Sequence, residues 1–278
     1  MHPVAHVLFR VSNQVTRWNL LHHGAAFPMY SVTEYPKSGG TWLTRMTADV
    51  LGVPFPWRSC SPVAMASVVH NHWPYHPRMR GRVVYMYRDG RDIMVSFYFH
   101  RLRWIHHPQN PRYLKFRPVY DRLFGKGYDW EDCRAHLARF MEHEFAHPND
   151  CRQTWREHLE SWLGPGNDAR GREGVSYVSY EQLREDCGGA LARVAGELSG
   201  KEPEAWRVKM AVEKFSMERM TGRRPGQESK GEFIRKGVVG DWVNHFTRES
   251  AELFDRLAGD MLVRLGYERD RSWVSRLA

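Results

Sequence analysis

Residues 29–42, MYSVTEYPKSGGTW, decide the fold of this 278-residue chain. The stretch 29–35 has the partial alternation of a short strand, and a proline ends it. Ser38 to Gly40 then make a flexible tight turn, after which Thr41 can cap a helix that runs to about residue 50. The segment therefore predicts a strand, a tight loop and a helix in direct succession.

Further strands alternate with helices along the chain. We expect strands at 81–88 and 174–179, and helices at 92–102, 130–145, 150–163, 180–200 and 248–266. Residues 104–127 are irregular and rich in Pro, His and Arg, which predicts a loop or lid. Strands separated by helices indicate an α/β fold, a single P-loop-like domain with a central, mainly parallel sheet flanked by helices. We expect one domain over 1–278, with an N-terminal helical segment at 1–27 and a variable insert at 101–150.

Composition is that of a globular protein with a basic surface. Apolar residues make up 42% of the chain and aromatic residues 13%, which argues against a disordered protein. The net charge of +9 should attract an anion, such as nucleic acid, a membrane surface or a polyphosphorylated nucleotide. Because the basic residues are dispersed along the chain, a dedicated nucleic-acid binder is disfavoured.

The N-terminal segment is amphipathic. No apolar run reaches the roughly 18 residues that cross a bilayer, and the first 30 residues lack a signal-like apolar core, so we expect a cytoplasmic protein. Six apolar residues recur at helical spacing, namely Val4, Val7, Leu8, Val11, Val15 and Trp18. The segment is expected either to pack on the domain as a helix or to make a peripheral contact with a membrane or a partner.

The cysteines and histidines carry no metal signature. Cys60, Cys133, Cys151 and Cys187 stand far apart without a C-x-x-C pair, so we expect reduced thiols. The cluster His70, His72 and His76 suggests a metal, but no H-E-x-x-H motif or carboxylate–histidine signature accompanies it. We therefore expect no metal cofactor.

The loop between the first strand and its helix has the chemistry of an oxyanion site. Backbone N–H groups, a helix N-terminus and Lys37 lie around one point, which suits phosphate or sulfate. The lysine precedes the glycines, so the loop differs from the G-x-x-x-x-G-K-[ST] loop of nucleoside triphosphatases.

Residues 35–42, YPKSGGTW, resemble the 5′-phosphosulfate loop of the cytosolic-type sulfotransferases, usually written YPKSGTTW. These enzymes depend on 3′-phosphoadenosine 5′-phosphosulfate (PAPS). Three more segments follow in the family's order: YRDGRD at 87–92 with Ser96 resembles the 3′-phosphate segment, SYEQL at 179–183 the YEDL element beside the adenine, and RKGVVGDW at 235–242 the RKGxxGDW segment. The resemblance covers about residues 30–270 and is weakest at 101–150.

The resemblance implies in-line transfer of a sulfuryl group from PAPS to a hydroxyl or amine of a small-molecule, lipid or glycan acceptor, with 3′-phosphoadenosine 5′-phosphate (PAP) as product. Lys37 would serve the leaving phosphate oxygen. His72 would be the general base, because residues 70–74, HNHWP, stand where the family has K-x-H-x-P. Cofactor contacts are implied for Lys37, Ser38, Gly39, Gly40, Thr41, Trp42, Arg88, Ser96, Tyr180, Met217, Arg235, Lys236 and Gly237. Lysine and arginine would supply the positive charge, so no metal is implied.

Three positions depart from the family pattern. His70 stands in place of a lysine, Gly40 in place of a threonine, and Phe215-Ser216-Met217 in place of Thr-Ser-Phe. These changes weaken the expected contacts to the sulfuryl group, the 5′-phosphate and the adenine. A nucleotide-dependent phosphotransferase and a non-catalytic module that binds anions or nucleic acid stay as alternatives. Residues 104–145 and the N-terminal segment would enclose the acceptor.

Overall fold

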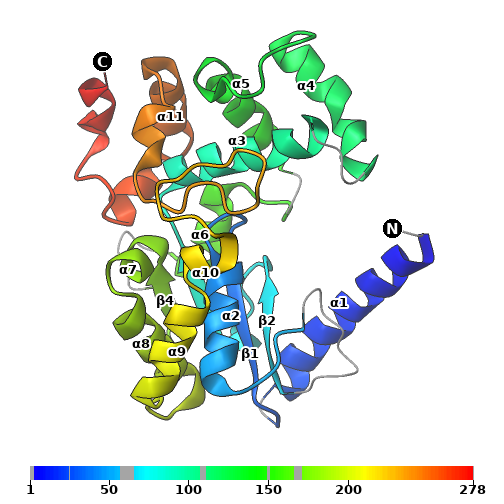
Figure 1. Ribbon diagram of the computed structural model, residues 1–278, viewed down its shortest axis with the longest axis vertical. Coiled ribbons are helices and arrows are strands. Elements are labelled where there is room, and N and C mark those ends of the chain that lie inside the picture. The colour runs from blue at the N-terminus through cyan, green and yellow to red at the C-terminus, as the bar shows by residue number, and fades with distance from the viewer. Residues whose placement is uncertain are drawn as a thin grey trace. The chain divides into compact units, whose positions relative to one another are not determined.

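The computed structural model describes residues 3–24, 26–56, 66–106, 111–148, 151–165 and 171–277. The chain divides into two compact units (Figure 1). Unit 1 comprises Met1–Tyr87, Ser161–Gly164 and Arg170–Gly222, and unit 2 comprises Arg88–Glu160, Pro165–Ala169 and Arg223–Ala278. Cys60 lies outside the described residues, while Cys133, Cys151 and Cys187 are free thiols.

Unit 1 is built on a four-stranded parallel sheet with the strand order β2-β1-β3-β4 (Figure 1). Its strands are β1 (Met29–Glu34), β2 (Ser67–Asn71), β3 (Val83–Tyr87) and β4 (Ser176–Ser179). All the strands run the same way, so their carboxyl ends share one edge, where ligands bind in open α/β sheets. The predicted α/β fold class with a central parallel sheet is confirmed. The strand β2 was not predicted.

Helices cover one face of this sheet. Buried residues of β1, β2 and β3 form an apolar core with α2 (Gly40–Leu51), α8 (Cys187–Ser199) and α9 (Ala205–Lys214). The helix predicted at 180–200 is divided into α7 (Tyr180–Glu185) and α8. Asp186 explains the break, because its carboxylate accepts the N–H of Gly189 and caps α8. The burial of this apolar face is the main force that holds α2 against β1.

The first helix, α1 (Pro3–His23), packs through a different face from the one that the sequence predicted. Thr16 and Leu20 are buried, whereas Val7, Leu8, Val11, Val15 and Trp18 are 41–63% exposed. These five side chains of the apolar stripe are therefore exposed, and a contact of the stripe with a membrane or a partner stays a prediction. No helix within the described ranges is long and apolar enough to cross a membrane.

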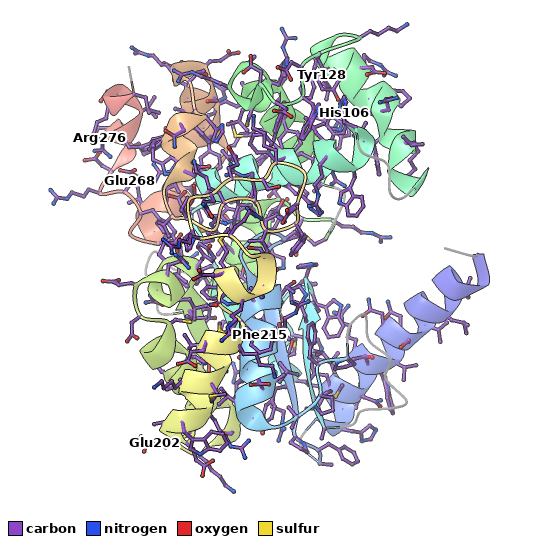
Figure 2. All side chains as sticks on the ribbon, viewed as in Figure 1. His106, Tyr128, Glu202, Phe215, Glu268 and Arg276 are labelled. Atoms are coloured by element: carbon purple, nitrogen blue, oxygen red, sulfur yellow. The ribbon has the colours of Figure 1, made fainter. Side chains whose placement is uncertain are left out.

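Unit 2 is helical. A buried helix, α3 (Gly90–His106), contacts α5 (Cys133–Ala146), which also contacts α11 (Arg248–Arg264). The prediction of a loop at 104–127 was wrong, because the described part contains the 3₁₀ helix η3 (Pro111–Phe116) and α4 (Arg117–Phe124). Pro118 fits the first turn of α4, where a backbone N–H has no intrahelical partner. The hydroxyl of Tyr128 lies 3.0 Å from Nε2 of His106 (Figure 2).

The remaining elements are α6 (Trp155–Leu163), α10 (Met217–Thr221), η2 (Pro77–Met79), η4 (Asp241–Asn244) and η5 (Arg271–Arg276).

Candidate functional site

The loop after β1 has an unusual backbone. Lys37 has φ 79° and Gly39 has φ 105°, and a positive φ is rare for a residue with a side chain. Ser38 is fully buried, and its hydroxyl and N–H both donate to the carbonyl of Tyr35, over 2.8 and 3.2 Å. These bonds fold the chain into a concave turn of backbone amides at the N-terminus of α2. Ser38 thus shapes the loop in this structure.

The turn presents donors to a ligand. The N–H groups of Gly39 and Thr41 make no hydrogen bond to any other described residue, while the N–H of Trp42 donates to the carbonyl of Gly39 over 2.9 Å. Unpaired N–H groups at a helix N-terminus, with half-buried Lys37 two residues before Gly39, fit a phosphate or sulfate group.

Glu34, the last residue of β1, is a part of the site that sequence reasoning missed. Its carboxylate accepts the N–H of Gly40 and is almost fully buried. A Cβ atom at Gly40 would lie 2.6 Å from the carboxyl carbon of Glu34, closer than van der Waals contact allows. A residue with a side chain at position 40 would therefore force the buried Glu34 side chain to shift. The available signal was a glutamate next to Tyr35, at the end of an otherwise buried strand.

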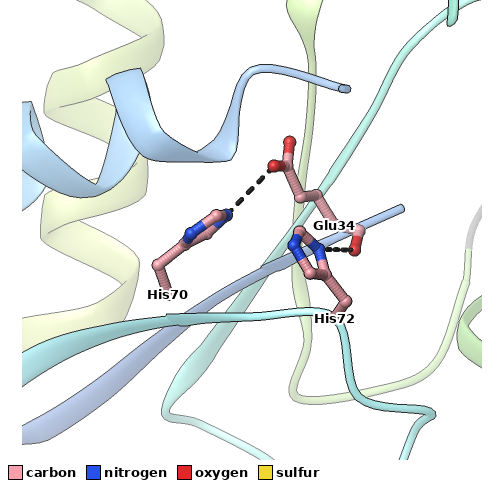
Figure 3. Close-up of side chains that lie close together, drawn as sticks. All are labelled: Glu34, His70 and His72. Atoms are coloured by element: carbon pink, nitrogen blue, oxygen red, sulfur yellow. Dashed lines mark hydrogen bonds and ion pairs between the residues drawn. The ribbon is translucent and has the colours of Figure 1, made fainter. Parts of the chain in front are cut away.

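Glu34 also contacts both histidines of the β2 strand end (Figure 3). Nε2 of His70 lies 3.0 Å from Oε1 of Glu34, and Nδ1 of His72 lies 2.9 Å from its backbone carbonyl oxygen. Burial alone would raise the pKa of Glu34, but the hydrogen bond from His70 and the nearby imidazoles and Gly40 N–H outweigh it and lower that pKa. The carboxylate is therefore ionised at neutral pH and accepts the Nε2–H of His70.

The carbonyl contact fixes the tautomer of His72. A carbonyl oxygen can only accept, so Nδ1 of His72 carries the proton and the neutral ring has its lone pair on Nε2. The chain after His72 is also held in place. The indole N–H of Trp162 donates to the carbonyl of Trp73 over 3.0 Å, and the N–H of Tyr75 donates to Oγ of Ser161 over 2.8 Å. His72 is thus oriented as a proton acceptor.

The predicted adenine-side residues lie close together in unit 1. The indole N–H of Trp42 donates to the carbonyl of Phe215 over 2.9 Å, at the end of α9 (Figure 2). The rings of Trp42 and Tyr180 meet edge to face with centroids 6.1 Å apart. Tyr180 also packs against Gly39, where an added Cβ would lie 2.9 Å from its ring. Met217 is buried and begins α10, two residues after Phe215. The aromatic residues therefore border the loop after β1.

Unit 2 holds the predicted 3′-phosphate residues, and Asp92 organises them. Nη2 of Arg88 donates to Asp92 over 3.1 Å and to the carbonyl of Val238 over 3.0 Å. The N–H groups of Gly240 and Trp242 each donate to Asp92 over 2.9 Å. One carboxylate therefore joins the start of α3 to the 235–242 segment. Ser96 lies one helical turn beyond Asp92 in α3, on the same helix face.

Asp241 is the second organising carboxylate of unit 2. It accepts from Arg235 and, over 2.5 Å, from Nζ of Lys236, and it is only 4% exposed. Asn244 and His245 also contact it, at 3.0 and 3.3 Å. Burial opposes ionisation, but the hydrogen bonds from His245, Lys236 and Arg235 hold the pKa of Asp241 far below its usual range.

The two carboxylates fix predicted cofactor cations. Arg88 is held by Asp92, and Arg235 and Lys236 are held by Asp241. Gly237, the next residue, has φ 66°, a backbone conformation that favours glycine. The arrangement orders positive charge before any ligand binds, which lowers the entropic cost of binding an anion.

Gly40 and Glu34 should be energetically coupled. Gly40→Ala should lower the free energy of unfolding by about 1–3 kcal/mol, because the added methyl overlaps the buried carboxyl group. The loss should be smaller in a Glu34→Ala background, where that space is open. A double-mutant cycle by urea unfolding measures the coupling, and strictly additive effects would refute it. Gly231→Ala is the control, because Gly231 has open space around it and no positive φ.

Asp241→Asn should lower the free energy of unfolding at pH 7 by about 1.5–3 kcal/mol, since it removes charge-assisted hydrogen bonds. The folded-state pKa of Asp241 lies below its ordinary value of 3.8, so this stabilisation is complete well above that pH and is lost as the pH falls through the folded-state pKa. Urea unfolding should show the gap between wild type and variant narrowing by about pH 3. A constant gap would contradict the assignment, and Asp260→Asn is a surface control.

Comparison with known proteins agrees with these features. A family model described as "Sulfotransferase domain" matches residues 58–266, more than half of the chain. Human sulfotransferase 2B1 is 26% identical over 81% of this chain and 63% of its own length, less than two thirds of that relative. Human sulfotransferase 2A1 is 25% identical over 85% of each chain.

Two solved structures show the same fold. Mouse sulfotransferase SULT7A1 complexed with PAP has a TM-score of 0.56 and 18% identity, covering 90% of this chain and 89% of its own. Retinol dehydratase in a complex with retinol and PAP has a TM-score of 0.54 and 17% identity, covering 84% and 81%. Because the family model spans most of the sequence, the chain belongs to the PAPS-dependent sulfotransferase family, as its four ordered motifs predicted.

Proposed function

We propose that this chain transfers a sulfuryl group from PAPS to a hydroxyl or amine group of a small-molecule acceptor. The observation that carries the proposal is the double role of Glu34. Its carboxylate binds the phosphate loop at Gly40, and its carbonyl orients His72. An oxyanion loop and a proton acceptor are thereby held at neighbouring strand ends, which is the combination that attack by a hydroxyl on a sulfuryl group requires.

In this proposal each site residue of unit 1 has a distinct role. Nε2 of His72 accepts the proton of the acceptor hydroxyl as that hydroxyl attacks. Lys37 stabilises the negative charge that develops on the leaving phosphate oxygen. The N–H groups of Gly39 and Thr41 bind the 5′-phosphate, because they have no other partner among the described residues. Trp42 and Tyr180 contact the adenine, with Met217 beside them. PAPS itself supplies the electrophilic sulfur and the leaving group.

Recognition of the 3′-phosphate is assigned to unit 2. Arg88, Arg235 and Lys236 supply charged donors, and the hydroxyl of Ser96 and the N–H of Gly237 supply neutral ones. An arginine is suited to a doubly charged oxyanion because its planar fork can donate two parallel bonds. The carboxylates Asp92 and Asp241 keep these donors in position.

The acceptor is proposed to be a small apolar alcohol. The related structures were solved with retinol and with androsterone, which are both apolar alcohols. The aromatic residues that the sequence assigned to the acceptor are in part internal to unit 2. Tyr120 and Phe140 are buried and stacked, with ring centroids 6.2 Å apart. Fewer aromatic side chains of the 104–145 region are therefore left to line an acceptor site than the sequence suggested.

The alternatives differ in their cofactor. A phosphotransferase would need ATP and Mg²⁺, and a binding module for nucleic acid or glycans would show no dependence on a 3′-phosphate. A binding module has no need of a histidine oriented as a proton acceptor, whereas a phosphotransferase could use one as its base, so the cofactor titration distinguishes these two alternatives.

Calorimetric titration with PAP, 5′-AMP and ATP, without added metal, tests the cofactor. We expect micromolar binding that depends on the 3′-phosphate. Arg88→Ala and Arg235→Ala should each weaken PAP binding by about 1.5–3 kcal/mol, the worth of a charge-assisted hydrogen bond. Arg248→Ala, which removes a largely exposed arginine of unit 2, should leave the affinity unchanged. Equal affinity for PAP and 5′-AMP would overturn the cofactor assignment.

Replacement of the base should separate turnover from cofactor binding. His72→Ala should lower turnover with a phenol or sterol acceptor by about 10²–10⁴-fold, the usual contribution of general base catalysis. PAP affinity should stay within a few-fold, because the base contacts the acceptor. His76→Ala, four residues along the chain, is the matched control. Normal turnover in the His72 variant would remove this residue as the base.

A further inference from the structure

Glu34 is a buried carboxylate without a basic partner of fixed charge. Its side chain is 4% exposed, and its carboxylate contacts the imidazole of His70 and the N–H of Gly40. No lysine or arginine in the described part of the chain forms an ion pair with it. Asp241 differs in this respect, since Arg235 and Lys236 both neutralise it. An ionised carboxylate that is removed from water requires a compensating positive charge.

The groups around Glu34 form a metal-ligating set. Glu34, His70 and His72 each offer one ligand atom, and these atoms lie within 4.8 Å of one another (Figure 3). The separation of His70 Nε2 from Glu34 Oε1 is already 3.0 Å. A tetrahedral Zn²⁺ with bonds of about 2 Å places its ligand atoms about 3.3 Å apart, so small side-chain rotations would suffice.

The second contact of His72 supports coordination. A histidine that binds a metal usually donates its other ring N–H to a carboxylate or a backbone carbonyl, which fixes the ring. Nδ1–H of His72 does this with the carbonyl of Glu34 and directs the lone pair to Nε2. Both imidazoles are half-buried, so an ion can reach them.

A second group of possible metal ligands differs from Glu34, because its carboxylates already have arginine and lysine partners. Glu228, Asp241 and His245 also bring ligand atoms together. However, Arg235 forms ion pairs with both Glu228 and Asp241, and Lys236 pairs with Asp241 as well. A divalent cation would have to displace these basic groups, so the argument applies to the Glu34 cluster alone.

We propose that Glu34, His70 and His72 bind one Zn²⁺ or a similar divalent cation. Two imidazole nitrogens and one carboxylate oxygen are its ligands, and the fourth coordination position is left for water. The ion replaces the proton between His70 and Glu34 and compensates the buried charge. Where His72 acts as the base of the proposed function, the ion also occupies its lone pair, and Zn²⁺ then inhibits turnover reversibly.

Calorimetric titration of chelator-treated, full-length protein with Zn²⁺, and with Mg²⁺ for comparison, tests the site without reference to activity. We expect one Zn²⁺ per chain and no comparable binding of Mg²⁺, which prefers oxygen ligands. Glu34→Gln and His70→Gln should each weaken Zn²⁺ binding by about tenfold or more. His76→Gln is the matched control, because His76 does not belong to the set of ligand atoms from Glu34, His70 and His72. Visible absorption of bound Co²⁺ should report a tetrahedral site in wild type and in His76→Gln, but not in Glu34→Gln or His70→Gln.

The possible results test the Zn²⁺ site independently of the proposed sulfotransferase function. Stoichiometric Zn²⁺ binding that both Glu34→Gln and His70→Gln reduce supports the site, whatever the PAP titration shows. Absence of Zn²⁺ binding, or binding that these variants leave unchanged while circular dichroism shows them folded, overturns it. Failure of PAP to bind would overturn the cofactor assignment and leave the Zn²⁺ result intact.

Discussion

The carboxylate of Glu34 is the contact on which the organisation of the unit 1 site depends. Its position at the end of the central strand β1 brings it to the N-terminus of α2, and its backbone carbonyl reaches the strand end of β2. The sheet register makes this possible, because Val32 of β1 lies opposite His70 of β2. A change at Glu34 would thus act on the phosphate loop and on both histidines at once.

In unit 2, carboxylates also hold other site residues in place, but there they are paired with arginine and lysine side chains. Asp92 and Asp241 each sit among donors, and the donors include the cations assigned to the 3′-phosphate. Such pairs hold flexible arginine and lysine side chains in one geometry, at the cost of part of their positive charge. A 3′-phosphate that bound there as proposed would therefore compete with these carboxylates, but it would meet donors that are already ordered.

The sequence predicted the parts of the fold whose signals are local. The strand, loop and helix at 29–50 follow from apolar patterning and the position of the glycines, and β3 is a strong run of β-branched and aromatic residues. The strand β2 was missed because SVVHN is short and contains His and Asn, so its strand character depends on pairing with β1. The helix α4 was missed because Pro118 suggested a loop, whereas the first helical turn tolerates proline.

The candidate site residues divide in the same way, into those with a local sequence signal and those without one. The four motifs predicted a site at the loop after β1 and at the basic segments, since each motif is contiguous. Glu34 was not identified, because its significance lies in contacts with His70, 36 positions away, and with the space above Gly40. A pairwise contact of this kind has no signature in a single sequence.

Two departures from the family pattern have one physical cause. Gly40 stands where the family has threonine, and His70 stands where it has lysine, and both contact the Glu34 carboxylate. A side chain at position 40 would overlap that carboxyl group, and the imidazole of His70 gives it a hydrogen-bond donor. A lysine at position 70 would bring a fixed positive charge to Glu34, whereas His70 contacts it through one imidazole nitrogen. Glu34 thus accounts for both replacements, since it occupies the space that a side chain at position 40 would need and bonds to the ring at position 70.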